Sequence, residues 1–209
     1  MMEMHMYIAF VVAAMVILVI PGPTIILVIS QAVAHGRRSV VPLAAGVVCG
    51  DFTAMTLSLC GLGAILSASA AVFVILKWVG AVYLVYLGIR LWRSNPGYQS
   101  IPRAANDASA GSLFRSAYIV TALNPKGIAF FVAFMPQFID PRNPVPAQLL
   151  LLGATFLLLA VTNATLYAVF AGHLSDTLRK SHVHKWFNRC GGCALIGAGI
   201  ITAGMRRSA

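Results

Sequence analysis

The stretch VIPGPT, residues 19–24, interrupts a long apolar run that continues on both sides of it. Proline has no backbone N–H and its ring clashes with the preceding turn, so Pro21 and Pro23 predict that a helix ends here. The flanking residues nevertheless stay apolar over about the length of one membrane crossing. The pattern therefore indicates one transmembrane span, residues 7–34, that is broken near its middle.

The composition indicates an integral membrane protein. Apolar residues make up 59% of the 209 positions and charged residues only 10%, whereas charged residues are about a quarter of an ordinary soluble domain. A membrane-spanning helix needs about 20 apolar residues, so the chain supplies roughly six spans and leaves no length for a soluble domain. The net charge of +10 does not indicate a nucleic-acid partner, because the basic residues lie in short gaps between apolar runs.

The apolar runs predict an all-α membrane protein of six transmembrane helices in one integral membrane domain, residues 1–209. The expected spans are residues 7–34, 40–66, 70–89, 113–135, 146–171 and 187–205. A polar linker at 90–112 separates a first repeat at 7–89 from a second at 113–205. Three spans per half reverse the direction of the second half, so two halves with a common fold form two inverted three-helix repeats.

The basic residues are distributed unevenly between the two sides of this topology. Ten of the fifteen lie in the gaps after the first, third and fifth spans, against three on the opposite side. Cytoplasmic loops are enriched in Lys and Arg, so both termini are expected outside. The C-terminal Arg206 and Arg207 run against this orientation.

A second proline interruption occurs at the corresponding position of the second half. The sequence TALNPKG places Asn124, Pro125 and Lys126 in the fourth span, about 20 Å along the helix from Leu113. Pro125 is expected to free the carbonyl of Thr121. Paired interruptions in corresponding segments are the best sequence indication of a transporter's binding site. Kinks that serve only helix packing are the alternative interpretation.

The first break predicts a site for an anion. Beyond Pro23, the N–H groups of Thr24, Ile25 and Ile26 are expected to have no partner within the helix. Such a helix N-terminus carries partial positive charge and binds anions, including a carboxylate. Irregular backbone at membrane depth persists only where it lines a cavity or is buried in protein. The expected substrate-binding residues are Pro21, Gly22, Pro23, Thr24, Asn124, Pro125 and Lys126.

Two ionisable residues lie within the spans near these breaks. Asp51 is in the second span and Lys126 in the fourth, and placing either at membrane depth costs about 2.5–3.5 kcal/mol. One carboxylate and one ammonium beside a helix N-terminus match a zwitterionic amino acid. In this interpretation Lys126 holds the substrate carboxylate, and Asp51 exchanges a proton for the substrate ammonium group. A static ion pair that fixes helix register is the alternative.

Metal binding and catalysis have weak sequence support. His182, His184, Cys190 and Cys193 lie within twelve residues, a spacing that fits zinc. Both cysteines, however, continue into an apolar helix in which cysteine serves as a small apolar residue. The spans contain no visible nucleophile–base pair and no multi-ligand metal site. The sequence therefore predicts a protein that is not an enzyme and needs no cofactor or metal.

Three blocks of the sequence are distinctive in combination: IPGPTIILVISQAVAHGRRSVVPLAAGVVCGD, LKWVGAVYLVYLGIRLWRS and TALNPKGIAFFVAFMPQFIDP. Together they resemble the LysE/RhtB family of bacterial exporters. The resemblance implies a small inner-membrane protein that exports amino acids or their derivatives, such as homoserine, threonine, lysine or leucine, with use of the proton gradient. It also implies functional positions at 21–23, at Gly50 and Asp51, and at 124–126.

One position departs from the family pattern. Asparagine commonly follows Pro-Gly-Pro in the family, whereas this chain has Thr24, which keeps a hydroxyl but lacks an amide. A cadmium-type metal exporter of the same superfamily is the alternative transport function, although Asp51 is the one hard oxygen ligand expected at membrane depth. The sequence leaves open the identity of the substrate and the proton stoichiometry. It also leaves open the oligomeric state, and a homo-oligomer is one possibility.

Overall fold

The computed structural model describes residues 3–68, 108–140 and 142–171, together with single helical residues between 78 and 93 and between 189 and 200. Within this part the chain is helical and contains no strand. The expected spans at 70–89 and 187–205 lie largely outside the described residues.

Among the described residues, two helical stretches are long and apolar enough to cross a membrane, Pro23–Gly61 and Val145–Val169. A bent pair of helices, Ala110–Ala122 and Pro125–Phe138, makes a third candidate span. The chain is therefore an α-helical membrane protein.

Both proline motifs break a helix, as predicted. α1 (Met4–Val19) ends before Pro21, and α2 (Pro23–His35) begins after Gly22, whose backbone is extended. α5 (Ala110–Ala122) is followed by α6 (Pro125–Ala129), and the two parts of this pair are bent by 41°. In each pair a proline is the first residue of the second helix, where its missing N–H is tolerated.

The helix that begins at Pro125 continues in irregular form. A π-helical segment, η2 (Phe130–Phe134), and a 3-10 turn, η3 (Met135–Phe138), follow α6. Pro136 lies in the first turn of η3 and has no N–H to donate, so the regular α-helical ladder is interrupted there. The fourth span therefore extends past its expected end at residue 135.

Two unbroken helices lie beside the broken ones. α3 (Val40–Ala68) follows a 3-10 turn, η1 (Gly36–Ser39), in which Gly36 has a φ of 63° that favours glycine. α7 (Val145–Val169) follows η3 after a short connection. The bounds of α3 and α7 agree with the expected spans at 40–66 and 146–171.

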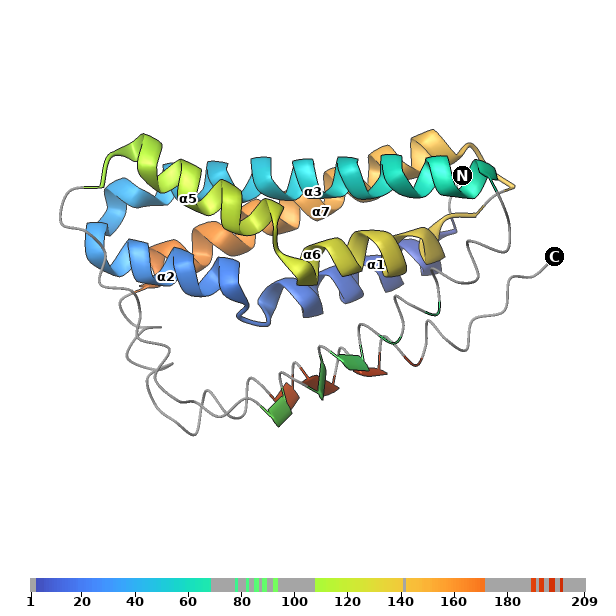
Figure 1. Cartoon of the computed structure of the whole chain (residues 1–209), viewed down its shortest axis with the longest axis horizontal. Helices are drawn as coiled ribbons and strands as arrows, with labels where there is room; N and C mark the ends of the chain where they lie inside the picture. Colours follow the sequence, from blue (N-terminus) through green and yellow to red (C-terminus); the bar gives the residue numbers. More distant parts are fainter. Residues whose placement is uncertain are drawn as a thin grey trace.

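All of these helices lie roughly along the long axis of the molecule (Figure 1). α1 followed by α2 runs from one end of the molecule to the other, and α5 followed by α6 runs in the opposite direction. The two breaks lie near the middle of this length, where they are joined by a hydrogen bond between Asn124 and Thr24.

Two glycines bring α3 close to α5. A Cβ atom on Gly46 would lie 2.5 Å from the carbonyl oxygen of Phe114, and one on Gly50 would lie 2.8 Å from that of Tyr118. Small residues four positions apart allow two membrane helices to approach this closely. The contact holds Asp51, which follows Gly50, against the second half of the chain.

A similar glycine contact joins residues of the expected third and sixth spans. A Cβ atom on Gly88 would lie 2.7 Å from the carbonyl oxygen of Gly192, and one on Gly192 would lie 2.6 Å from that of Gly88. Both residues are helical. The last expected span of each half therefore contacts the other at this point.

Buried apolar side chains form two clusters, one on each side of the breaks. The first, which we call the aromatic cluster, joins α1, α7 and η2. Phe130 and Phe131 both pack on Phe156 in it, with ring centroids 5.3 and 4.9 Å apart. The second, the aliphatic cluster, consists of smaller side chains of α2, α3, α5 and α7, including Val28 and Leu43.

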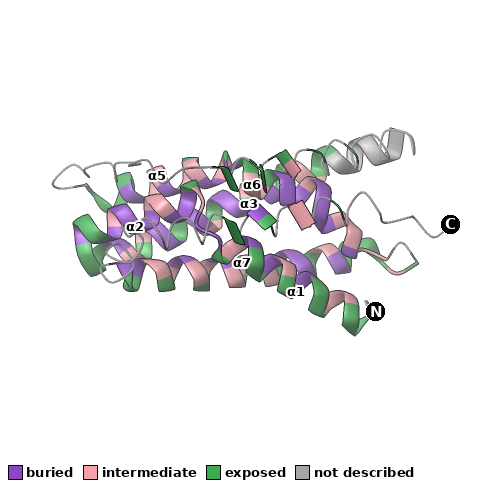
Figure 2. Ribbon diagram, turned by 90° about the horizontal axis from the view of Figure 1, so that it is seen from below, coloured by how far each residue is buried: buried purple, intermediate pink, exposed green. Residues whose placement is uncertain are grey.

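Exposed residues lie along the outward faces of the helices (Figure 2), and many of them are large apolar residues. Val41, Leu57, Leu150 and Leu158 each expose 66% or more of their surface. Soluble monomers rarely present large contiguous apolar surfaces to water. These faces are suited to contact with lipid.

Candidate functional site

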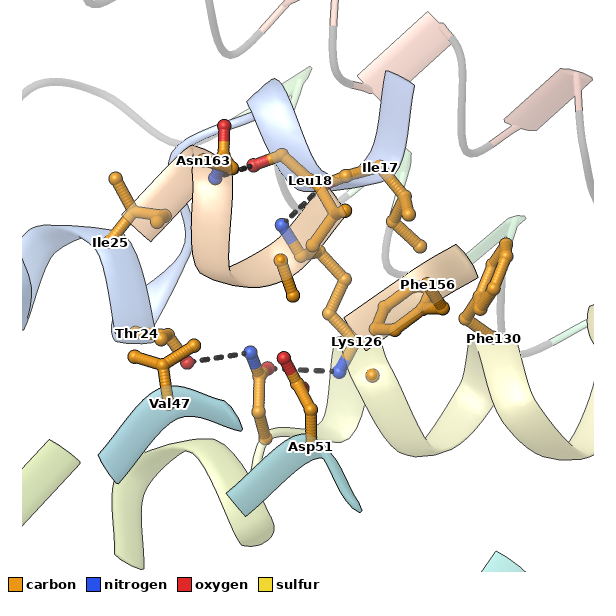
Figure 3. A pocket seen from close by; sticks show the side chains of 13 residues that line it. Ile17, Leu18, Thr24, Ile25, Val47, Asp51, Lys126, Phe130, Phe156 and Asn163 are labelled. Atoms are coloured by element: carbon orange, nitrogen blue, oxygen red, sulfur yellow. Dashed lines mark hydrogen bonds between the residues drawn. The ribbon is translucent and has the colours of Figure 1, made fainter. Parts of the chain in front are cut away.

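A small cavity lies at the level of the two breaks (Figure 3). Residues of α1, α2, α3, α6 and α7 line it, including Thr24, Asp51, Asn124, Lys126 and Asn163. Its volume is about 40 Å³, which is room for about three water molecules. In this arrangement the cavity is too small for an amino acid.

The end of α1 presents four consecutive backbone carbonyls, those of residues 17–20, that need partners outside the helix. Each of them accepts a hydrogen bond from a side chain of the second half. The bonds are Lys126 Nζ to Ile17 O (2.7 Å) and to Ile20 O (2.8 Å), Asn163 Nδ2 to Leu18 O (3.1 Å) and Tyr167 Oη to Val19 O (2.7 Å). The backbone freed by the Pro21 break is therefore satisfied by protein donors, as the absence of water at membrane depth requires.

Asn163 and Tyr167 contact the broken end of α1, and the sequence analysis did not single them out. They lie four residues apart in α7, and this spacing places them on one face of a helix. An amide and a phenol on one face of a largely apolar span were the available signal. The sequence around Asn163 and Tyr167 does not indicate that carbonyls of α1 are their hydrogen-bond acceptors.

Thr24 connects the two breaks. Its hydroxyl oxygen accepts a hydrogen bond from Asn124 Nδ2 (3.1 Å) and another from the Thr121 hydroxyl (3.3 Å). The side-chain oxygen of Asn124 accepts the Lys126 backbone N–H (3.1 Å) and so caps α6. Thr24, Thr121 and Asn124 are all buried. These hydrogen bonds join the N-terminus of α2 to the C-terminal end of α5.

Two expectations about freed backbone groups are wrong. The Ile26 N–H donates to the carbonyl of Gly22 (2.9 Å), which makes the first turn of α2 complete at that residue. The carbonyl of Thr121 accepts the Asn124 N–H (3.0 Å), because the chain tightens into a turn ahead of Pro125.

The N-terminus of α2 nevertheless keeps two donors. Within the part of the chain that the structure describes, the N–H groups of Thr24 and Ile25 have no recorded acceptor. Both residues line the cavity. A helix N-terminus with N–H groups directed at a cavity is suited to an anion or a carbonyl oxygen.

Asp51 is buried in α3, with 6% of its surface exposed, and its carboxylate points into the cavity (Figure 3). Among the described residues, no hydrogen-bond donor to this carboxylate is recorded. Its nearest approach to α6 is at Gly127, where a Cβ atom would lie 3.8 Å from Asp51 Oδ1. A buried carboxylate without a donor is costly, and a bound cation or proton relieves that cost.

A static ion pair between Asp51 and Lys126, the alternative interpretation of these two charges, is not formed. The Lys126 side chain extends away from Asp51 toward the end of α1 (Figure 3), and its ammonium does not lie within 4.0 Å of the carboxylate. The alternative of a static pair that fixes helix register is therefore wrong for this arrangement. Both charges line the same cavity.

The remaining expected site residues shape the backbone around the cavity. Pro21 is buried at the end of α1, while Pro23 and Pro125 are exposed as the first residues of their helices. Gly22 lies beside the Lys126 side chain, because a Cβ atom added to it would be 3.3 Å from Nζ.

The described residues contain no group of three His, Cys, Asp or Glu side chains placed to share a metal ion. Cys190 and Cys193 are exposed as free thiols. His182 and His184, the other members of the zinc pattern, lie outside the described residues.

Comparison with known proteins gives consistent matches along the chain. A family model described as "LysE type translocator" matches residues 15–204. The chain is 33% identical over 207 residues to the homoserine/homoserine lactone efflux protein of Salmonella typhimurium, covering 99% of this chain and 100% of the relative. The protein of the same name from Salmonella typhi is 32% identical over the same coverage.

Two further relatives are described only as membrane proteins. An uncharacterized membrane protein of Vibrio cholerae is 31% identical over 202 residues, which is 97% of this chain and 98% of the relative. One from Pseudomonas aeruginosa is 31% identical over 184 residues. No solved structure matches the chain.

Proposed function

The chain belongs to the LysE type translocator family, and from this premise we propose that it exports an amino acid or an amino-acid derivative across the bacterial inner membrane. Two relatives are named for the efflux of homoserine and homoserine lactone. We extend that substrate class to this chain as the first compounds to test.

The observation that carries the proposal is the buried Asp51 carboxylate, which points into a cavity between two broken helices without a donor from the described residues. A primary ammonium group supplies the missing positive charge and up to three N–H donors. Homoserine and its lactone both carry such an ammonium, so Asp51 binds the group that the two compounds share.

The other end of the substrate faces the N-terminus of α2. The N–H groups of Thr24 and Ile25 hold the carboxylate of an amino acid, or the carbonyl oxygen of a lactone. Lys126 has three N–H donors, two of which bond to α1, and its third contributes to holding the same carboxylate. Pro21, Gly22, Pro23, Asn124 and Pro125 position these groups.

We propose proton antiport as the source of energy. Asp51 binds either a proton or the substrate ammonium. A proton that arrives from outside therefore releases the substrate to the outside, and a substrate that arrives from the cytoplasm releases the proton inward. The repeats at 7–89 and 113–205 alternately separate on each side of the cavity, with the aromatic cluster closing one side and the aliphatic cluster the other. The opposite directions of the two broken helices in Figure 1 support this arrangement.

Uptake into inverted membrane vesicles tests the proposal. Labelled homoserine, homoserine lactone, threonine, lysine and leucine are supplied with and without an imposed proton gradient. Saturable uptake of at least one compound, increased by the gradient, is expected. Absence of any amino-acid transport together with saturable zinc or cadmium flux would establish the metal exporter instead.

Asp51→Asn tests the role of the carboxylate in the same vesicles. The amide keeps the shape but cannot release or bind a proton at neutral pH, so gradient-driven uptake is expected to fall to background. Glu3→Gln, which removes an exposed carboxylate far from the cavity, is the matched control and keeps full uptake. Wild-type rates with unchanged pH dependence in Asp51→Asn would make Asp51 a structural residue.

A further inference from the structure

We propose that the Lys126 ammonium is a tethered cation, held in a carbonyl-lined site at the end of α1, and that this site accepts a free small cation when the lysine side chain is removed. The inference deepens the proposed function, since it assigns Lys126 a task beyond substrate contact. Its test does not depend on transport.

The geometry around Nζ is that of a cation site. The ammonium donates to two carbonyl oxygens of one helix end, Ile17 O at 2.7 Å and Ile20 O at 2.8 Å. These distances are typical of charge-assisted hydrogen bonds. Carbonyls exposed at the end of a broken membrane helix are the groups that coordinate coupling cations in transporters with discontinuous helices.

The electrostatics of α1 require a positive charge at this point. The C-terminus of a helix carries partial negative charge, and a cation near it stabilises the helix. α1 has no basic residue in its own last turn. Lys126, which is more than 100 residues away in the sequence, supplies that charge from the other half of the chain.

The ammonium is closely packed on the side that faces α1. Gly22 lies next to the ammonium, and a Cβ atom there would be 3.3 Å from Nζ. The two intervening carbonyls, those of Leu18 and Val19, are taken by Asn163 and Tyr167. Removal of the lysine side chain therefore leaves two carbonyl oxygens aimed at one small vacant volume.

The assignment separates the roles of the two intramembrane charges. Asp51 is available to a mobile cation, because no donor to it is recorded among the described residues. The carbonyls of α1 are occupied by a cation that cannot diffuse away. The wild-type protein consequently needs no free sodium or potassium ion at the first break.

Thermal unfolding of the purified full-length protein in detergent tests this inference. Lys126→Ala is compared with wild type in choline chloride, sodium chloride, potassium chloride and ethylammonium chloride at equal ionic strength. In choline the Tm of Lys126→Ala is expected to fall by about 4 °C or more. Sodium, potassium or ethylammonium restores at least half of that loss, while the wild-type Tm is the same in all four salts.

Lys126→Met is the matched control, because its side chain fills the same volume without a charge. It is expected to be destabilised and to show no response to the cations. The inference is wrong if Lys126→Ala has wild-type stability in choline, or if its response to the cations equals that of Lys126→Met.

A second variant keeps the inference testable if Lys126→Ala does not fold. Lys126→Gln retains two N–H donors but no charge, so an intermediate Tm without cation response is expected, and wild-type stability would overturn the assignment. Asp51→Asn separates this test from that of the proposed function. It abolishes transport if export depends on Asp51, yet the double variant Asp51→Asn with Lys126→Ala keeps the cation response.

Discussion

Thr24 uses both acceptor positions of a single oxygen. A hydroxyl has two lone pairs and one proton, and the two acceptor bonds from Asn124 and Thr121 occupy the lone pairs. The hydroxyl proton is left for an acceptor in the cavity. The family resemblance implies asparagine at this position. Thr24 presents a hydroxyl in place of an amide and connects the two breaks.

Thr24→Val should destabilise the protein because it removes that oxygen while preserving size. The amide of Asn124 and the hydroxyl of Thr121 would then be buried without this acceptor. Each buried donor that loses its acceptor costs about 1–3 kcal/mol of stability. Thr24→Ser, which keeps the hydroxyl, is the control and should remain close to wild type. The Tm in detergent is the measurement, and equal Tm values for the two variants would show that the bonds contribute nothing.

The residues that break the helices could be predicted from the sequence. The residues that donate hydrogen bonds to the carbonyls freed at the first break could not. Pro21, Pro23 and Pro125 act on their own backbone, so their effect follows from local chemistry. The donors to α1 come from residues more than 100 positions away, and only the packed structure determines which side chains reach them. For the same reason the direction of the Lys126 side chain, toward α1 and away from Asp51, could not be predicted.

At the scale of elements, the α3–α5 contact positions Asp51. The glycines at 46 and 50 lie on one face of α3 and let the backbone of α5 approach. Any residue with a side chain at these positions separates the two helices. Because Asp51 is the next residue after Gly50, such a separation also moves the carboxylate relative to α2 and α6.

Gly50→Ala is therefore expected to be destabilising, although alanine is the better helix former. The added Cβ would lie 2.8 Å from the Tyr118 carbonyl oxygen and 3.0 Å from the Ala122 nitrogen, and backbone atoms cannot rotate away. Such overpacking costs about 1–3 kcal/mol, which exceeds the gain of about 0.5–1 kcal/mol from replacing a helical glycine.

Gly61→Ala in the same helix is the matched control for that substitution. A Cβ atom at Gly61 meets nothing within 4 Å, so this variant should be as stable as wild type or slightly more stable. The Tm of the two variants and their transport rates in vesicles are the measurements. A Gly50→Ala protein as stable and active as Gly61→Ala would contradict the role of the close contact.

At the scale of the whole molecule, a polar layer lies between two apolar clusters of different character. Thr24, Asp51, Asn124 and Lys126 occupy the middle, with the aromatic cluster toward one end and the aliphatic cluster toward the other. The two sides of the cavity are therefore packed by different kinds of side chain, aromatic rings on one side and aliphatic groups on the other.

The orientation of this arrangement rests on the distribution of basic residues. A single cysteine placed in the 94–110 linker, with Cys49, Cys60, Cys190 and Cys193 replaced, should be protected from a membrane-impermeant thiol reagent in intact cells. The same cysteine should react after permeabilisation. Labelling of intact cells would place the linker outside and reverse the expected topology, with both termini then inside.

The hydrogen bonds that distant side chains donate to the end of α1 also affect the synthesis and membrane insertion of the protein. Asn163 and Tyr167 are 145 and 148 residues beyond their acceptors, a separation that takes a ribosome about 7–30 s to translate. During this interval the carbonyls of Leu18 and Val19 lack these two donors. We therefore expect the nascent first half to depend on the insertion machinery until α7 has emerged.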